Sequence, residues 1–392
     1  MNVSRGLRVR LSASLLTATL WLLMASLSAN AQTFTIIHSF GAPNDGAYPV
    51  GSLLHDFQGN IYGASQGGGL GWGTVFEITA GGQERVLYNF QDGADGMLPF
   101  LSFVESGSIV GTTYQGGVNK FGTVFKLDSQ GKLTNLFSCC IQTGIGAFPG
   151  GAIQDIDGNL YVVAFAGGDF SCSLTGCGTI FKLNGPNTVT LVHTFGEVAG
   201  DGNFPNASLV RDAAGNLYGT TIYGGAYGWG TIFKIGPGGS ETVLYSFQGG
   251  ADGANPSNGV YRDSQGNLYG ATASGGSGNV GTVFKVTSSG EHLVLYNFNG
   301  SDGAQPIGGV ALDGNGNIYG ATYLGGCHNK GTIFKLNSFK LNSDGELTVL
   351  HEFSGTSDGE YPESVLPMNG ALYGVTNQGG TYNLGVVFKL IP

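Results

Sequence analysis

Short apolar runs recur along the chain at a spacing of about fifty residues. Each begins with a segment of the type Gly-Thr-Val-Phe or Gly-Thr-Ile-Phe, and the last copy reads Gly-Val-Val-Phe. The intervals between successive starts are 49, 56, 52, 51, 50 and 54 residues. Seven copies of one unit predict a repeat architecture. The start glycines are Gly73, Gly122, Gly178, Gly230, Gly281, Gly331 and Gly385.

Each unit holds four apolar runs of strand length, which we label a to d. In the fourth unit they are "PNASLVRD", "NLYGTT", "GTIFKI" and "ETVLYSF". The connections are short, which favours antiparallel neighbours. Strand c is apolar at successive positions, as expected for a sheet covered on both faces. Four-stranded sheets repeated radially around an axis provide such cover, so the pattern predicts an all-β propeller.

The two ends of the repeat array complement each other. Residues 33–40, "TFTIIHSF", form a strand d with no strand c before it, and the chain ends in "GVVFKLIP", a strand c with no strand d after it. Joining them completes a seventh blade and removes the exposed sheet edges. We therefore expect one seven-bladed propeller over 32–392, with four antiparallel strands per blade. The expected blades are 49–90, 99–139, 149–195, 205–247, 256–298, 306–353, and 362–391 together with 33–40.

Residues 1–31 have the pattern of a secretory signal peptide. Arg5, Arg8 and Arg10 precede the apolar stretch "LSASLLTATLWLLMASL", and "ANA" offers small residues for cleavage before Gln32. A membrane anchor that stays attached is the alternative. We predict an exported protein, periplasmic or extracellular, with no membrane span after signal cleavage.

The composition narrows the class of protein further. The chain has 392 residues, 72 of them glycine, with 41% hydrophobic and 11% charged residues, which is too apolar for a disordered chain. Removing three arginines with the signal leaves 13 basic and 26 acidic residues, a net charge of −13. No cluster of positive charge is visible, so a nucleic-acid partner is not expected. We expect a monomer.

Five cysteines suggest one local disulfide. In "CSLTGC", Cys172 and Cys177 stand at the two ends of one loop, and an exported protein favours their pairing over two free thiols. Cys139, Cys140 and Cys327 have no obvious partner. No Cys/His set has zinc-site spacing, so the sequence predicts no metal site and no cofactor.

The unit "NLYGTT…GG…GTIFK…VLYSF…DG…P" resembles the GloVer tandem repeat of exported bacterial proteins, over nearly all of the mature chain. The resemblance implies an exported repeat protein and brings no established activity. The turn D-x-x-G-N-[LI]-Y is also similar to that of NHL-type and lactonase-type propellers. That similarity supports the fold more than any function.

Candidate ligand-binding residues lie on the face that carries the d–a turns and the b–c loops. The aspartates of the D-G-x-x-P turns repeat in six of seven units, where unit three has Ile145. They either cap their own turns or form an acidic ring around the channel mouth that holds a cation or polar ligand. These aspartates are Asp45, Asp95, Asp201, Asp252, Asp302 and Asp358.

Two tryptophans on the same face and three histidines of strand d also have a structural and a functional interpretation. Trp72 and Trp229 precede two of the start glycines and either stack on a sugar ring or pack against the next blade. His38, His193 and His351 occupy a strand d position that is tyrosine in other units, which favours packing. No G-x-S-x-G, H-E-x-x-H or S-x-x-K motif is present, so no catalytic residue is assigned.

These observations favour an exported, non-catalytic binding or scaffold module for carbohydrate or an extracellular protein partner. The sequence leaves catalysis open. The alternative is a propeller enzyme of lactonase or polysaccharide-lyase type, which needs unrepeated acid, base or metal-ligand residues that converge on the channel.

Overall fold

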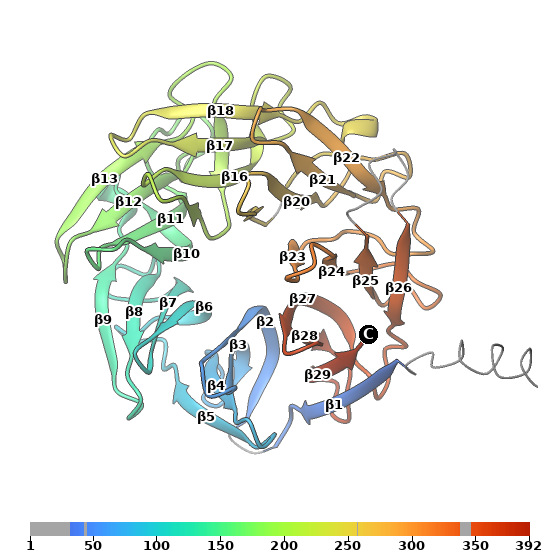
Figure 1. Cartoon of the computed structure of the whole chain (residues 1–392). Helices are drawn as coiled ribbons and strands as arrows, with labels where there is room; N and C mark the ends of the chain where they lie inside the picture. The colour runs from blue at the N-terminus through green and yellow to red at the C-terminus, as the bar shows by residue number, and fades with distance from the viewer. Residues whose placement is uncertain (1–31, 43–44, 257, 338–345) are drawn as a thin grey trace, which may run out of the picture.

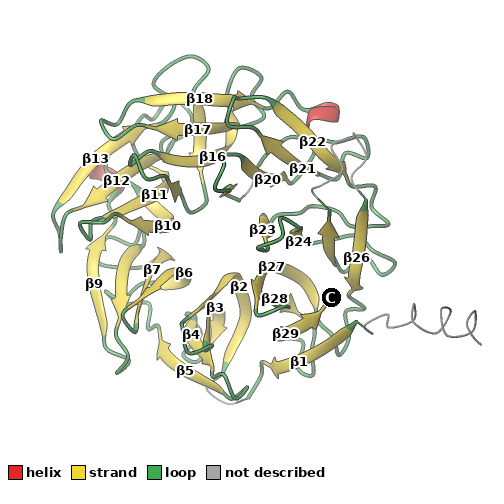
Figure 2. Cartoon of the chain, in the orientation of Figure 1, coloured by secondary structure: helices red, strands yellow, loops and turns green. Residues whose placement is uncertain are grey.

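The computed structural model describes residues 32–42, 45–256, 258–337 and 346–392. Seven antiparallel sheets are arranged radially around a central axis, so the chain is a seven-bladed β-propeller (Figure 1). The described helical residues are two short 3-10 turns, Ile141–Thr143 and Gly250–Asp252 (Figure 2). The predicted signal peptide, residues 1–31, lies outside the described residues.

Blades 1 to 7 follow the chain, each running from the innermost strand a to the outermost strand d. Blade 1 contains β2 (Gly46–His55), β3 (Ile61–Gly68), β4 (Thr74–Ile78) and β5 (Glu84–Asn89), blade 2 contains β6 (Met97–Glu105), β7 (Ser108–Gln115), β8 (Thr123–Leu127) and β9 (Leu133–Ser138), and blade 3 contains β10 (Ala147–Gln154), β11 (Leu160–Ala166), β12 (Thr179–Leu183) and β13 (Val189–Thr194). Blade 4 contains β14 (Gly202–Pro205), β15 (Val210–Arg211), β16 (Leu217–Gly224), β17 (Thr231–Ile235) and β18 (Glu241–Ser246), and blade 5 contains β19 (Tyr261–Arg262), β20 (Leu268–Thr272), β21 (Thr282–Val286) and β22 (His292–Asn297). Blade 6 contains β23 (Val310–Leu312), β24 (Ile318–Thr322), β25 (Thr332–Leu336) and β26 (Leu347–Glu352), and blade 7 contains β27 (Glu360–Met368), β28 (Ala371–Gln378), β29 (Val386–Ile391) and β1 (Thr33–Ser39).

The ring is closed as the sequence predicts. In blade 7 the strand order is β1-β29-β28-β27, so the N-terminal strand supplies the outermost strand beside the C-terminal one. Ile36 lies opposite Phe388, and His38 lies opposite Val387. This pairing gives β29 a hydrogen-bonded neighbour on both sides and leaves no unfinished blade.

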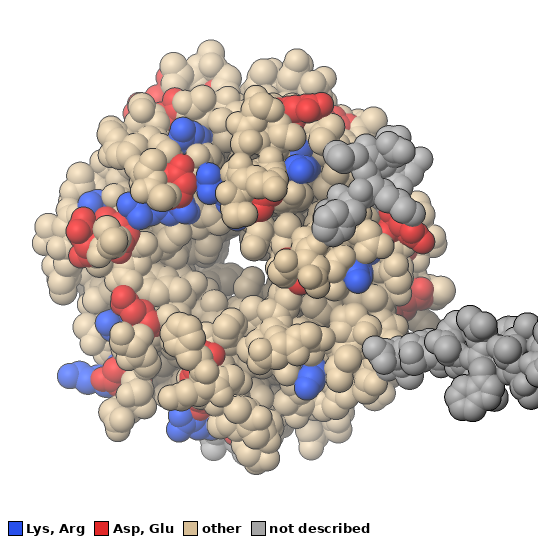
Figure 3. Space-filling view, viewed as in Figure 1, with Lys and Arg blue, Asp and Glu red and all other residues tan. Residues whose placement is uncertain are grey.

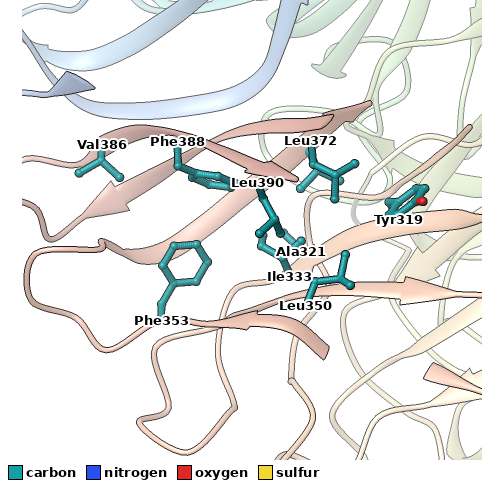
Figure 4. Packing of buried hydrophobic residues seen from close by; sticks show 10 residues of the cluster. Tyr319, Ala321, Ile333, Leu350, Phe353, Leu372, Val386, Phe388 and Leu390 are labelled. Carbon is teal, nitrogen blue, oxygen red and sulfur yellow. The ribbon is translucent and has the colours of Figure 1, made fainter. Parts of the chain in front are cut away.

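The hydrophobic core is divided among the seven seams between blades. At the seam between blades 6 and 7, Phe353 from the end of one blade lies 5.6 Å from Phe388 in strand c of the next, measured between ring centroids. Leu350, Leu372 and Leu390 pack around these rings (Figure 4). Equivalent phenylalanine pairs occupy five further seams, at 5.0 to 5.4 Å. Packing between neighbours therefore explains why strand c is apolar on both faces.

The D-x-x-G-N-[LI]-Y motif holds the hairpin between strands a and b. In blade 4, Asp212 accepts hydrogen bonds from the backbone N–H and the side-chain amide of Asn216 and from the hydroxyl of Tyr218. The same three bonds recur in blades 1, 5 and 6. The motif is therefore a structural turn, which accounts for its repetition.

One detail of strand a differs from expectation. The expected blades begin at the turn proline, but β2, β6, β10 and β27 begin before Pro49, Pro99, Pro149 and Pro362. Strand a is the edge strand on the channel side of each sheet, so a residue without an N–H is tolerated there.

In the part of the chain that the structure describes, no helix has the length and hydropathy needed to cross a membrane.

Candidate functional site

A cavity of about 510 Å³ lies on the axis of the ring, where the strand a segments of all seven blades converge. Figure 3 shows the opening at the centre of one face, with charged side chains scattered around it. Most of the lining is serine, asparagine, glycine and apolar side chains. Among the described lining residues, Glu363 is the only carboxylic acid, and there is no histidine, lysine or arginine.

Glu363 stands at a channel position whose residue differs from unit to unit. It follows Pro362, and the residues that follow the equivalent prolines include Val50, Phe100 and Asn206. Burial among the strand a segments raises the pKa of the Glu363 carboxyl to about 7, against a hydrogen bond from the backbone of Gly51 that lowers it. One side chain at the axis therefore changes charge near neutral pH.

The residue before each turn proline has a left-handed backbone in all seven blades. Its N–H donates to the carbonyl of the residue that precedes the start glycine of the previous blade. Such a conformation is uncommon outside glycine and is retained where surrounding contacts fix it. Because the conformation is repeated, it orients seven side chains at the seams on the b–c loop face. The residues and their φ angles are Tyr48 (57°), Leu98 (59°), Phe148 (56°), Phe204 (56°), Asn255 (56°), Gln305 (54°) and Tyr361 (61°).

Three of these side chains contact an aromatic residue at the end of strand b in the preceding blade, and two of the three ring pairs are stacked. Tyr114 and Phe148 lie 5.1 Å apart between ring centroids, and Tyr323 and Tyr361 lie 4.9 Å apart. Phe204 and Phe165 lie 5.0 Å apart, with their ring planes tilted by 31°. Tyr114 also lines the axial cavity, so this aromatic layer reaches the channel.

The six predicted aspartates serve their own turns. Asp252 accepts a hydrogen bond from the backbone N–H of Gln248 and one from the hydroxyl of Tyr245. Each of the other five also accepts at least one backbone N–H of its d–a turn. None of the six lines the axial cavity, because the turns hold their carboxylates beside the outer strand d.

The two predicted tryptophans are partly packed and partly exposed. Trp72 is 41% exposed and Trp229 is 46% exposed. Their backbone carbonyls accept hydrogen bonds from Leu98 and Asn255 of the next blade. The Trp229 ring lies so close to Gly249 that a β-carbon there would come within 2.9 Å of its indole nitrogen. The Trp229 ring therefore packs on the d–a turn that leads to the next blade, while nearly half of the residue stays exposed.

Cys172 and Cys177 form a disulfide within the b–c loop of blade 3, with their Cα atoms 5.2 Å apart. It packs against Gly196 in the following d–a turn, whose N–H donates to Asp201. Cys139 is buried, Cys140 is half-buried and Cys327 is exposed, and all three are free thiols.

A second cavity, of about 580 Å³, lies between blades 1 and 2 on the opposite face. Its ionisable lining residues include Asp56, which is held by the a–b turn, and Glu77, which forms an ion pair with Arg85. Glu77 stands where other blades have a strand c lysine such as Lys126, so Arg85 replaces the missing positive charge. These polar groups already have partners within the fold.

Among the described residues, two groups of metal-ligand type also form at the seams. His38, Asp45 and Glu84 come together between blades 7 and 1, and His193, Asp201 and Glu241 come together between blades 3 and 4. Linear spacing could not reveal them, because each group joins two blades. One sequence feature could have revealed them. In both groups a histidine near the end of one strand d is followed by a glutamate at the start of the next strand d along the chain.

Comparison with protein-family models identifies the family. The model of the Gloeobacter/Verrucomicrobia repeat matches residues 23–213 and 171–388, so the chain belongs to this repeat family. The resemblance stated from the repeat unit is thereby confirmed. No curated protein sequence matches the chain significantly.

Solved structures with a similar fold include several enzymes. A gluconolactonase from Xanthomonas campestris shares 11% identity over 94% of this chain and 92% of that chain, with a TM-score of 0.47. A PQQ-bound aldose sugar dehydrogenase from Streptomyces coelicolor shares 12% over 92% of this chain and 98% of that chain, with a TM-score of 0.47. A puromycin-hydrolysing peptidase from Mycobacterium tuberculosis shares 13% over 86% of this chain and 53% of that chain, with a TM-score of 0.51. At these identities the likeness concerns the fold alone.

Proposed function

We propose that the protein is an exported, non-catalytic binding module that takes an uncharged, carbohydrate-like ligand at its axial cavity. The supporting observation is the cavity lining, in which hydroxyl and amide side chains and aromatic rings surround a single carboxyl group, that of Glu363. A volume of about 510 Å³ lies within the range of small-molecule sites. Sugars use this combination, because their ring faces stack on aromatic rings while their hydroxyls form hydrogen bonds.

The same lining argues against hydrolysis by paired carboxylates. Glycoside hydrolysis needs two carboxyl groups that flank the scissile bond, and metal-assisted hydrolysis needs several ligands around an open position. Among the described residues of the axial cavity, Glu363 supplies one such group and none accompanies it. Export rests on the predicted signal peptide at residues 1–31.

A propeller enzyme of lactonase or polysaccharide-lyase type is the second candidate, favoured by one observation. A carboxyl group with a pKa of about 7 suits general acid–base chemistry near neutral pH. In that function Glu363 would transfer a proton to or from the substrate.

A binding screen with matched variants separates the two functions. The purified protein is screened on a glycan array, and each hit is measured by calorimetry with Tyr114→Ala, Glu363→Gln and the control Phe57→Ala. Phe57 is fully exposed on the opposite face. We expect Tyr114→Ala to weaken binding about tenfold, which corresponds to about 1.4 kcal/mol, and Phe57→Ala to have no effect. Turnover of a bound lactone or uronate polymer that Glu363→Gln abolishes would support the enzyme, and hits unaffected by Tyr114→Ala would place the ligand elsewhere.

A further inference from the structure

The histidine, aspartate and glutamate groups at two of the seven seams have the composition of a metal centre. We propose that His38, Asp45 and Glu84, and separately His193, Asp201 and Glu241, bind two divalent metal ions of the zinc class. In each group one atom from each side chain lies within 4.8 Å of the other two. The proposal concerns the outer part of the seams and is independent of the axial cavity.

The first seam shows how the fold assembles such a group. His38 stands near the end of β1, Asp45 lies in the turn that leads into blade 1, and Glu84 opens strand d of that blade. The Nε2 atom of His38 lies 2.9 Å from the Asp45 carboxylate, whose other partners are the backbone N–H groups of Gly41 and Gly46. The aspartate is therefore held in place by its turn, and the other two side chains approach it from two blades.

The second seam repeats the arrangement. The Nε2 atom of His193 lies 3.5 Å from a carboxylate oxygen of Glu241, and Asp201 is fixed by the N–H groups of Gly196 and Gly202. The Cys172–Cys177 disulfide packs on the same turn. The most irregular loop of the repeat thus supports one of the two groups.

Both groups contain buried side-chain atoms that have no hydrogen-bond partner. Oε1 of Glu84, Oε1 of Glu241 and Nε2 of His193 are buried and have no hydrogen-bond partner. The Glu241 side chain is only 9% exposed. Buried polar atoms are almost always satisfied, so three such atoms in these two groups support a missing ligand. One further atom of this kind, Nε2 of His292, lies at the 4/5 seam.

The charges of both groups favour a cation. Each group holds two carboxylates, Asp45 with Glu84 and Asp201 with Glu241, whose oxygen atoms lie within 4.8 Å of each other. Two carboxylates brought together in a buried seam repel each other, and a bound divalent cation removes that repulsion.

The donor set selects the zinc class. An imidazole with two carboxylates suits zinc, which accepts four ligands and leaves the fourth position here to water. Calcium requires six to eight oxygen ligands, more than these groups supply. A metal at each place would connect the outer strands of successive blades, at the 7/1 seam beside the ring closure and at the 3/4 seam.

The other seams provide matched controls because they fill the same three positions differently. At the 6/7 seam His351 contacts Asp358, but the third position is Phe34, whose ring stacks on His351 at 3.8 Å. At the 4/5 seam Tyr245 and Asp252 are accompanied by His292. Tyrosine is thus a natural occupant of the histidine position, and replacing histidine by tyrosine should preserve the fold.

The test measures zinc stoichiometry in a Cys327→Ser background, which removes an exposed thiol. After equilibration with zinc chloride and gel filtration, we expect two zinc ions per chain. The single variants His38→Tyr and His193→Tyr should each bind one zinc ion per chain. The double variant that combines them should bind none, and His351→Tyr should bind two. Glu84→Leu and Glu241→Leu should weaken their own site at least tenfold, since leucine occupies this position at other seams. Zinc should raise the melting temperature of the parent but not of the double variant, with circular dichroism as the check of folding.

Three results would overturn the proposal. The first is that the parent protein binds no zinc. The second is that the folded double variant binds as much zinc as the parent, and the third is that His351→Tyr loses as much zinc as His38→Tyr. Calcium retained in preference to zinc would overturn the assigned metal class.

Discussion

Ile36 on β1 lies opposite Phe388 on β29, so residues from the two ends of the chain share one sheet. Phe388 is fully buried at the seam, where its ring also contacts Phe353 of blade 6. Phe388 therefore takes part both in the sheet that closes the ring and in the packing between blades 6 and 7.

Phe388→Ala should destabilise the protein by about 3–5 kcal/mol, because it removes a buried ring and leaves a cavity at the closing blade. Urea unfolding followed by tryptophan fluorescence measures the change. Phe57→Ala is the control, since this ring is exposed and its loss should cost less than about 0.5 kcal/mol. Equal effects of the two substitutions would contradict the packing described for the seam.

Asp212→Asn should destabilise the protein at pH 7 by about 1–3 kcal/mol. Burial opposes ionisation of this carboxyl, but hydrogen bonds from Asn216 and Tyr218 outweigh it and lower the pKa below the usual 3.8. The stabilisation is therefore present above the ordinary aspartate pKa and is lost as the pH falls through the lower folded value. Unfolding at pH 7 and pH 3 checks this, with exposed Asp157→Asn as the control. A difference that persists unchanged at pH 3 would argue against the hydrogen-bonded carboxylate.

Glu363→Gln should stabilise the protein at pH 8 and have little effect at pH 4. Burial raises the pKa of this carboxyl to about 7, so the wild type is favoured below the ordinary glutamate pKa and loses stability as the pH rises through 7. The gain is at most about 3 kcal/mol and is reduced by the water that enters the channel. Thermal unfolding across this pH range measures it, with exposed Glu105→Gln as the control. If the two variants have the same pH profile, the channel carboxyl is not perturbed.

Replacing Cys172 and Cys177 together by serine should lower the stability by about 2 kcal/mol, the value expected for a short closed loop. Reductant should lower the melting temperature of the parent protein by a similar amount and leave the double variant unchanged. Cys327→Ser is the control, because that thiol is exposed and free. A reductant effect of the same size in the double variant would show that another process is responsible.

The repeat architecture could be predicted from sequence because the contacts that shape each unit lie between residues of that unit. The Asp212–Asn216–Tyr218 turn is local, and the apolar strand c reports burial on both faces, so the number of blades and the closure followed from the pattern. Capping of their own turns was one of the two interpretations given for the d–a aspartates, because these contacts are also local.

The residues that break the repeat could not be assigned in the same way. Glu363 was not among the predicted site residues, because a glutamate after a proline does not reveal that its side chain lines the channel where seven strands converge. The His193–Asp201–Glu241 group has no short-range sequence signature, because it joins strands d of different blades and its members are far apart in the chain.

The repeat unit, the number of blades and the pairing of the end strands can be read from the residues alone, because they depend on contacts within a unit or between similar neighbours. Which unrepeated side chains meet depends on the folded ring. Radial packing brings the innermost strands to one axis and places the outer strands of adjacent blades side by side, and these distances are set by closure of the whole ring.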